Sequence, residues 1–166
     1  YLAPKFRSLG FGHPDEFFAM ALERAWHASP RATRRFVSIG AGNCDTEVRV
    51  AKLLAARGVS GFVIECVELS PAMLERGREH ARAEGVAAMI RPVRADFNAW
   101  DPGGPCDAVM ANQSLHHETN LEGLFDAIAG ALDSRGLFVT SDMIGRNGHQ
   151  RWPEAAAIVR EFWREL

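Results

Sequence analysis

The sequence predicts a single α/β domain in which helices cover both faces of a parallel sheet. Three observations support this class. Short apolar runs alternate with longer amphipathic segments five times along the chain. The apolar runs are of strand length, and glycine or proline stands where many of the elements begin or end. No internal repeat interrupts the alternation, so we expect one sheet with a ligand site beyond the carboxyl ends of its strands.

The first long helix is expected at 14–28, where Pro14 suits the first helical position and acidic residues follow in the first turn. Its apolar stripe is predicted to consist of Phe17, Met20, Ala21 and Trp26. The apolar run at 36–40 is the first predicted strand, and it ends in Gly40. The next helix is expected at 45–57. Its inner face is predicted to hold Val48, Ala51, Leu54 and Ala55.

The second strand is predicted at 61–69 and the following helix at 70–84, with Ser70 as its N-cap. The third strand falls within 87–96. Pro92 places it near the sheet edge, because proline cannot donate to a strand ladder. The remaining predicted elements are strands at 106–112 and 136–143 and helices at 120–132 and 152–166.

The stretch FVSIGAGNCDTE, residues 36–47, joins the first strand to the helix after it. Gly40-Ala41-Gly42 allows a tight turn and a close approach of the backbone to a ligand. A dinucleotide fingerprint requires a small residue at position 45, which is Asp45 here. Two carboxylates in the first helical turn, Asp45 and Glu47, disfavour a pyrophosphate and are compatible with a neutral or cationic ligand. Alternatively, they only complement the helix dipole.

Further candidate ligand groups follow the second and third strands. Glu68 ends the second strand, where a carboxylate can accept both hydroxyls of a ribose in either class of cofactor. Leu69 and Met73 are expected to flank an adenine. After the third strand, Asp96 can accept from an exocyclic amine, and the backbone N–H of Phe97 can bond a ring nitrogen. Alternatively, Asp96 forms a local turn.

Four segments in this order, FVSIGAGNCDTE, CVELSPAML, RADF and DAVMANQSLHH, resemble the consecutive motifs of class I S-adenosylmethionine-dependent methyltransferases. The resemblance covers about residues 36–143. It implies a three-layer Rossmann-like fold with strand order 3-2-1-4-5 and S-adenosylmethionine as the cofactor. The residues that it assigns to cofactor binding are Gly40, Ala41, Gly42, Glu68, Leu69, Asp96, Phe97, Asn112 and Gln113.

The sequence departs from this family pattern in three places. Ser38 stands where an acidic residue is often found two positions before the first glycine, and Cys44 replaces the third glycine of the loop. The turn before the fifth strand reads Asp-Ser-Arg-Gly at 133–136, where the family often has Pro-Gly-Gly.

The family usually adds two more strands after the helix that follows the fifth strand. The chain stops at Leu166, inside or just after that helix. The apolar fifth strand is therefore expected to form an open edge. We expect this edge to be covered by a continuation of the protein, another domain or a subunit.

Methyl transfer needs a base only when the acceptor is a protonated group such as a hydroxyl. His116 and His117 follow the fourth strand on the expected cofactor side, and His117 is the first candidate for a base. Alternatively, these histidines only pack or bond the backbone. The loop at 142–152 is expected on the acceptor side, and it supplies His149 as the second candidate. Other polar residues of that loop are Asp142 and Asn147.

The whole chain, 1–166, is expected to form one methyltransferase-like domain. It would comprise an N-terminal helix and linker at 1–35, a cofactor-binding core at 36–143, and an acceptor-side loop with a last helix at 144–166. Phe11, His13 and Phe17 would form either a lid over the cofactor or ordinary packing. The expected activity is methyl transfer to an oxygen or nitrogen atom of a small molecule. The alternatives are a non-catalytic cofactor-binding or docking module and an NAD(P)-dependent oxidoreductase.

Composition limits the partners and the setting. The formal net charge of −2 argues against a nucleic-acid partner, and no apolar run is long enough to span a membrane. The three cysteines, Cys44, Cys66 and Cys106, show neither metal-binding spacing nor an even-numbered disulfide framework. We therefore expect no metal site and a reduced, cytoplasmic setting.

Overall fold

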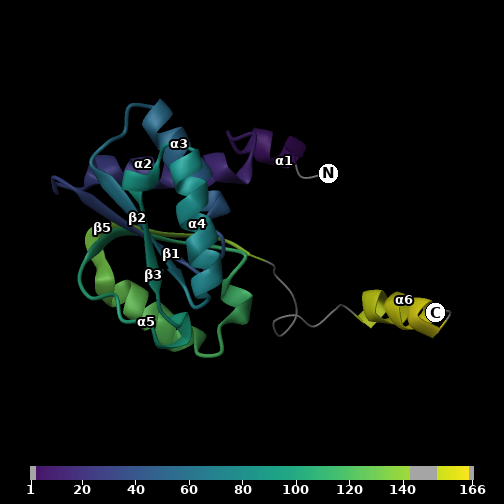
Figure 1. Ribbon diagram of the computed structural model, residues 1–166. Helices are drawn as coiled ribbons and strands as arrows, with labels where there is room; N and C mark the ends of the chain where they lie inside the picture. Colours follow the sequence, from purple (N-terminus) through teal and green to yellow (C-terminus); the bar gives the residue numbers. More distant parts are fainter. Residues whose placement is uncertain (1–2, 143–152, 165–166) are drawn as a thin grey trace.

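The computed structural model describes residues 3–142 and 153–164, and its centre is one parallel five-stranded sheet (Figure 1). The strand order is β3-β2-β1-β4-β5, which confirms the predicted order 3-2-1-4-5. The strands are β1 (Arg34–Ile39), β2 (Phe62–Glu68), β3 (Ile90–Arg94), β4 (Cys106–Asn112) and β5 (Leu132–Ser141). The third strand, which contains Pro92, lies at an edge as predicted.

Helices cover both faces of this sheet. The α-helices are α1 (Ala3–Ser8), α2 (Pro14–Ala28), α3 (Asp45–Ala56), α4 (Pro71–Ala83), α5 (Leu121–Ala131) and α6 (Pro153–Arg164). Three 3-10 turns are η1 (Ala87–Met89), η2 (Phe97–Ala99) and η3 (Leu115–His117). Figure 1 shows α2, α3 and α4 on one face and α5 on the other, which gives three layers. The sequence did not predict α1 or the 3-10 turns.

Local capping explains where several helices begin. Ser70 caps α4, as predicted, because its Oγ accepts the N–H of Met73 at 3.3 Å. Asn120 caps α5 in the same way by accepting the N–H of Gly123. These side chains bond backbone N–H groups that have no partner inside the helix, so α4 and α5 begin where the sequence offers a polar cap.

The strands alternate between two apolar cores. One core lies under α2, α3 and α4; its large buried side chains include Phe18, Leu22, Phe36, Leu54, Ile64 and Met110. The other lies under α5; its buried side chains include Val37, Ile39, Val67, Val109, Leu124 and Ile128. Neighbouring residues of β1 and β4 thus face opposite layers, as expected for strands that are covered on both sides.

The predicted apolar stripe of α2 was wrong in its centre. The side chains of α2 that are buried in the core are Phe18, Ala19, Leu22 and Ala25. Met20 is 44% exposed, while Phe17, Ala21 and Trp26 pack at the margin of the core. The helix contains apolar residues around much of its circumference, so sequence spacing alone did not identify the face that meets the sheet.

The turn predicted at 133–136 is part of β5, which begins at Leu132. The pairing of β5 with β4 shifts register between Cys106 and Ala108, so the extra residues are accommodated as an irregularity in the strand. Arg31 contributes to this end of the sheet, because its guanidinium bonds both Asp107 and Asp133. In the described chain β5 pairs only with β4 and forms the second sheet edge.

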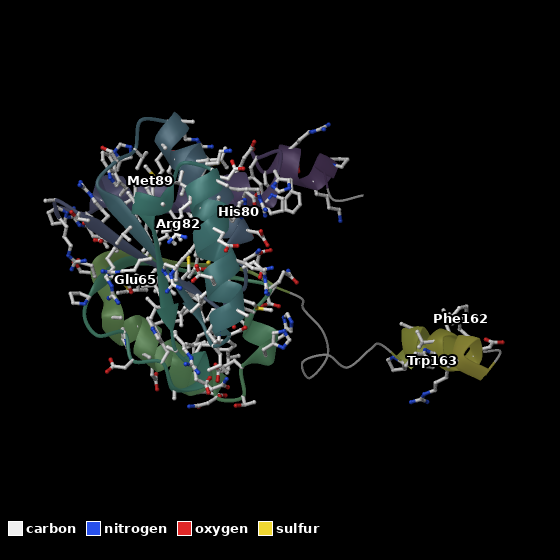
Figure 2. All side chains as sticks on the ribbon, in the orientation of Figure 1. Glu65, His80, Arg82, Met89, Phe162 and Trp163 are labelled. Atoms are coloured by element: carbon white, nitrogen blue, oxygen red, sulfur yellow. The ribbon has the colours of Figure 1, made fainter. Side chains whose placement is uncertain are left out.

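Two further findings concern the outer parts of the chain. On α6 the side chains of Ile158, Phe162 and Trp163 are exposed, and Figure 2 shows the last two on that helix. Within the described residues, no helix combines the length and apolar character that crossing a membrane requires.

Candidate cofactor and acceptor site

A hollow of about 460 Å³ lies at the carboxyl ends of β1, β2 and β4, beside the residues that follow β3. Its lining residues are Gly40, Gly42, Glu68, Leu69, Met73, Asp96, Phe97, Asn98, Gln113, Ser114 and His117. Seven of the nine residues assigned to cofactor binding are in this set, together with Met73 and His117. Asn98 and Ser114 were not predicted. We call this site the strand-end hollow.

The glycine loop forms one wall of the strand-end hollow. Gly40 has φ +67°, and a Cβ atom there would lie 2.6 Å from the Cβ of Ser114. Ser114 is itself fixed, because its hydroxyl donates to the carbonyl of Ile39 at 2.7 Å. Gly42 has φ +56°, and a Cβ there would meet nothing within 4 Å. The first glycine therefore allows close packing, while the second presents bare backbone to open space.

Glu68 connects the second strand to the glycine loop. Its Oε2 accepts the N–H of Gly42 at 3.1 Å, and its Oε1 accepts the N–H of Ser70 at 2.8 Å. Each carboxylate oxygen can accept a further hydrogen bond, so both remain capable of binding a vicinal diol. The adjacent Leu69 is 53% exposed and adds an apolar surface beside the hollow.

Asp96 has the local role that the sequence left open. Its Oδ1 accepts the N–H of Asn98 at 2.9 Å and caps the 3-10 turn η2. This turn brings Phe97 and Asn98 into the lining of the strand-end hollow. The capping bond uses one carboxylate oxygen, so the turn and an exocyclic amine can be bound by the same side chain.

Two assigned residues do not line the hollow. The side-chain amide of Asn112 donates to the Thr46 hydroxyl at 3.0 Å, which ties β4 to α3. Ala41 packs against the core, and its N–H donates to the carbonyl of Val67 at 3.0 Å. Gln113 does line the hollow and has φ +54°, a conformation that is uncommon for a residue other than glycine.

Ser38 stands where the family often has an acidic residue, and the carboxyl group of Glu47 lies beside it. The Ser38 hydroxyl donates to Oε1 of Glu47 at 2.6 Å, and Glu47 is 2% exposed. Burial raises the pKa of Glu47 to about 7. Among the described residues, Oε2 of Glu47 has no hydrogen-bond partner. Glu47 therefore points into the core, so the sequence argument that counted it as a charge at the ligand loop was wrong.

Cys44 fits the place of the third loop glycine because α4 makes room for it. Cys44 has φ +58° and is buried at the start of α3. On the facing helix, a Cβ at Gly77 would lie 2.6 Å from the Cys44 sulfur. The Cys44 side chain therefore occupies the space that Gly77 leaves by having no side chain.

The histidine pair after β4 makes two different sets of contacts. His117 lines the strand-end hollow, and its ring centroid lies 4.1 Å from that of His116. His116 Nδ1 lies 2.7 Å from Oδ1 of Asp142, the residue after β5. Oδ2 of Asp142 accepts the N–H of Leu115 at 2.7 Å. His149 and Asn147 lie outside the described residues.

The His116–Asp142 pair is the contact at this edge of the sheet that sequence reasoning missed. Asp142 was placed only among the polar residues of the following loop, although it is adjacent to the end of β5. The signal available in the sequence was the parallel sheet, since residues that follow neighbouring parallel strands lie at the same edge.

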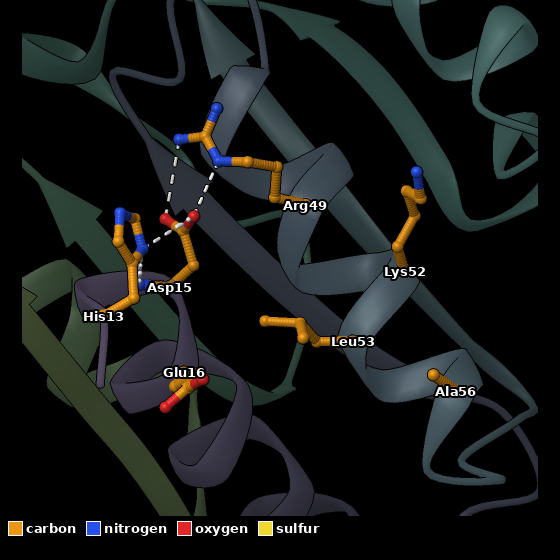
Figure 3. Close-up of a pocket in the computed structure, with 7 residues that line it drawn as sticks. All are labelled: His13, Asp15, Glu16, Arg49, Lys52, Leu53 and Ala56. Carbon is orange, nitrogen blue, oxygen red and sulfur yellow. Dashed lines mark hydrogen bonds and ion pairs between the residues drawn. The ribbon is translucent and has the colours of Figure 1, made fainter. Parts of the chain in front are cut away.

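A second hollow of about 460 Å³ lies between α2 and α3 (Figure 3). Its charged groups bond one another or nearby groups, and Glu16 accepts the backbone N–H of Gly12. Arg49 Nε donates to Asp15 Oδ2 at 2.6 Å, and this bond raises the pKa of the Arg49 guanidinium. His13 Nδ1 accepts the N–H of Asp15, and Lys52 pairs with Glu84. Because none of its described lining residues belongs to a strand, we assign ligand binding to the strand-end hollow.

The strand-end hollow fits a nucleoside with an amino-acid tail. It offers a carboxylate for a diol, exposed apolar carbon beside that carboxylate, and a bare glycine backbone along the same wall. Its volume lies within the range of about 300–1,000 Å³ that is usual for small-molecule sites.

Comparisons with known proteins agree with this fit. A family model described as a methyltransferase domain matches residues 37–136, more than half of the chain. Trans-aconitate 2-methyltransferase of Streptomyces coelicolor is 27% identical over 104 residues, which cover 60% of this chain and 33% of that protein. The chain thus spans about a third of the length of this curated relative.

Solved structures show the same fold. A SAM-dependent methyltransferase from Thiobacillus denitrificans in complex with S-adenosyl-L-homocysteine matches with a TM-score of 0.64 at 19% identity, over 90% of this chain and 55% of that chain. The cyclase SpnF matches with a TM-score of 0.65 at 20% identity, over 91% of this chain and 56% of that chain. Since one of these neighbours is named a cyclase, the fold alone does not specify the reaction.

The family match spans the glycine loop, the second and third strand ends and β4, the segments that build the strand-end hollow. The chain therefore belongs to the methyltransferase domain family, and it has the fold of class I S-adenosylmethionine-dependent methyltransferases.

Proposed function

We propose that this chain transfers the methyl group of S-adenosylmethionine to an oxygen or nitrogen atom of a small molecule. The observation that carries the proposal is the convergence of Gly42, Glu68, Phe97 and His117 on one hollow. These residues follow different strands, and the sheet brings them together at the edge where ligands of such folds bind.

Each part of the hollow has a proposed role toward the cofactor. Glu68 accepts the ribose hydroxyls, while Leu69 and Met73 flank the adenine. Asp96 accepts from the adenine amine, and the Phe97 backbone bonds a ring nitrogen. The loop Gly40-Ala41-Gly42 lies along the methionine part, and Asn112 and Gln113 border the methyl group, with Asn112 acting through its bond to Thr46.

The reaction itself requires little from the protein beyond placement. The cofactor supplies an activated methyl group, and the chain holds it against the acceptor and excludes water. A base is required when the acceptor atom carries a proton that must leave. His117, in the wall of the strand-end hollow, and His149, outside the described residues, are the candidates from the sequence.

A titration experiment separates this function from its two alternatives. S-adenosylhomocysteine, S-adenosylmethionine and NAD are titrated calorimetrically into the chain. Transfer of an isotopically labelled methyl group is then measured with panels of phenols, amines and carboxylic acids. We expect both adenosyl ligands to bind, NAD to give no heat, and the label to appear on oxygen or nitrogen. Binding of NAD would favour an oxidoreductase, and adenosyl binding without transfer to any acceptor would favour a docking module.

Two further aspects of the function are also proposals. A further domain or subunit covers the β5 edge, which is supported by the partly exposed apolar residues Leu137 and Phe138 of that strand and by the greater length of the relatives. A cytoplasmic setting is supported by Cys44, Cys66 and Cys106, which are buried and form no disulfide. Amide exchange of Leu137–Ser141 in the presence and absence of candidate partners would test the first, and localisation of the tagged protein would test the second.

A further inference from the structure

A third hollow, of about 400 Å³, lies beside the carboxyl end of β5. Phe6, Phe11 and Phe17 wall it, and Thr140, Ser141 and Asp142 line the side of the strand. The rings form a continuous row, with centroids 5.6 Å apart between Phe6 and Phe11 and 5.3 Å apart between Phe11 and Phe17. We call this site the aromatic hollow.

The aromatic hollow adjoins the strand-end hollow across one strand pairing. Asn112 of β4 pairs with Ser141 of β5. Gln113, which lines the strand-end hollow, donates its backbone N–H to the carbonyl of Ser141 at 2.8 Å. Glu68 lies on the other side of β1 from these two strands. A cofactor whose ribose is at Glu68 therefore extends toward β4, and its far end approaches the aromatic hollow.

A histidine and a carboxylate connect the linings of the two hollows. The ring of His116 lies tilted against that of His117, which lines the strand-end hollow, and its Nδ1 bonds Asp142, which lines the aromatic hollow. His116 and Asp142 each have side chains that are 12% exposed. An ionised carboxylate only accepts hydrogen bonds, so the pairing with Asp142 favours the imidazole tautomer of His116 that carries its proton on Nδ1.

We propose that the aromatic hollow binds the methyl acceptor, that the acceptor is an apolar ring compound with a hydroxyl or amine group, and that His116 accepts its proton while Asp142 orients the imidazole. This inference rests on the methyl transfer proposed above. Phenylalanine rings bury the most apolar surface when the ligand that they cover is itself flat and apolar.

The chemistry balances without another reactant. The lone pair of the acceptor oxygen or nitrogen forms the bond to the methyl carbon. The bond between that carbon and sulfur breaks, and its electron pair stays on sulfur. The acceptor proton moves to Nε2 of His116, and the resulting imidazolium is paired with the carboxylate of Asp142.

The charges that line the aromatic hollow argue against an acceptor such as trans-aconitate, which the name of the curated relative contains. A tricarboxylate such as trans-aconitate requires cationic or multiple N–H donors to replace its hydration. Among the described residues that line the aromatic hollow there is no lysine or arginine, and Asp142 contributes a carboxylate. The described lining therefore favours an uncharged ring over a polyanion.

The test uses the chain saturated with S-adenosylhomocysteine and follows its amide NMR spectrum as 2-naphthol or trans-aconitate is added. We expect 2-naphthol to shift Phe11, Phe17 and Thr140, and trans-aconitate to leave these amides unchanged. Phe11→Ala should weaken 2-naphthol binding about five- to tenfold. Phe125→Ala, which removes a partly exposed ring from the opposite face of the sheet, is the matched control and should leave it unchanged.

The outcomes distinguish this inference from the proposed function. Failure of S-adenosylhomocysteine to bind would overturn the proposed function. Three results would overturn the acceptor class alone if the cofactor binds normally. They are an absence of shifts with 2-naphthol, equal effects of Phe11→Ala and Phe125→Ala on its binding, and shifts of the aromatic hollow with trans-aconitate.

Imidazole NMR tests the base. In the wild-type chain the tautomer of His116 should be the one with its proton on Nδ1, and Asp142→Asn should redistribute the proton between the two ring nitrogens. A wild-type His116 protonated on Nε2 at neutral pH would overturn its role as proton acceptor. A tautomer unchanged by Asp142→Asn would overturn the positioning role of Asp142.

Discussion

The two halves of the carboxyl edge of the sheet are built in different ways. The half proposed to bind the cofactor is made of short segments that each follow a strand, and much of its surface is backbone or carboxylate, as at Gly42 and Glu68. The half proposed to bind the acceptor is made of side chains from distant parts of the chain, where Phe6 and Phe11 line one hollow with Asp142. The difference teaches that a common ligand can be held by local motifs, while a particular ligand is selected by long-range packing.

The largest effect should come from filling the space beside the first glycine. Gly40→Ala forces a positive φ onto alanine and brings its Cβ against the fixed Ser114. We expect a loss of about 2–5 kcal/mol in unfolding free energy, the sum of overpacking and left-handed strain. Urea denaturation measures it.

Gly85→Ala is the matched control for this change. Gly85 also has a positive φ, +74°, but a Cβ there meets nothing within 4 Å. Its replacement should cost only about 1–2 kcal/mol from strain. Equal losses for the two variants would show that close packing against Ser114 is not what requires Gly40.

The next effect concerns the carboxyl group beneath the glycine loop. The pKa of Glu47 is raised from 4.5 to about 7, so the folded state holds the proton more tightly than the unfolded state. The contribution of protonated Glu47 to the free energy of unfolding is therefore fully present below pH 4.5 and declines as the pH rises to about 7. The loss is about 3 kcal/mol, because each pKa unit corresponds to about 1.36 kcal/mol.

Glu47→Gln should remove this part of the pH dependence, as measured by denaturation from pH 4.5 to 8. The exposed Glu79 on α4 supplies the control Glu79→Gln, which should keep the wild-type profile. A Glu47→Gln profile parallel to that of the wild type would contradict the buried, proton-binding state of Glu47.

Glu68→Ala should weaken S-adenosylhomocysteine binding by about 1.5–3 kcal/mol, the range for hydrogen bonds to a charged group. Part of this loss reflects the loop, because Glu68 also accepts the N–H of Gly42. Calorimetric titration measures the change. Unchanged affinity in a folded variant would remove Glu68 from the cofactor site.

The smallest effect is expected when a residue of the proposed acceptor half is substituted and cofactor affinity is measured. Phe11→Ala alters the aromatic hollow, and Phe11 does not line the strand-end hollow. Its effect on S-adenosylhomocysteine affinity should stay below about 0.5 kcal/mol, as for independent sites. A loss as large as that of Glu68→Ala would mean that the two halves are one site.

The same contrast explains what could be predicted from the sequence. Strand order and most element bounds follow from apolar periodicity and from caps such as Ser70, which act within a few residues. Gly40 and Glu68 were found because each stands at a strand end. The apolar face of α2 was misplaced, since tertiary packing selects Phe18 over Met20.

The parts of the site that escaped prediction depend on contacts between distant segments. The pairing of His116 with Asp142 requires the adjacency of β4 and β5. The carboxyl group beside Ser38 comes from α3, so a sequence motif that looks only at the strand finds none. Asn112 bonds Thr46 and does not line the hollow, although its position in the sequence suits a ligand contact.

The most direct test of the cofactor site is an amide NMR titration of the chain with S-adenosylhomocysteine. The strand-end hollow predicts the largest shifts at Gly42, Leu69, Phe97 and Ser114. The amides of Leu53 and Ala56, in the hollow between α2 and α3, should stay in place (Figure 3). Shifts concentrated at Leu53 and Ala56, or no shifts at millimolar ligand, would contradict the assignment of the cofactor to the carboxyl ends of the strands.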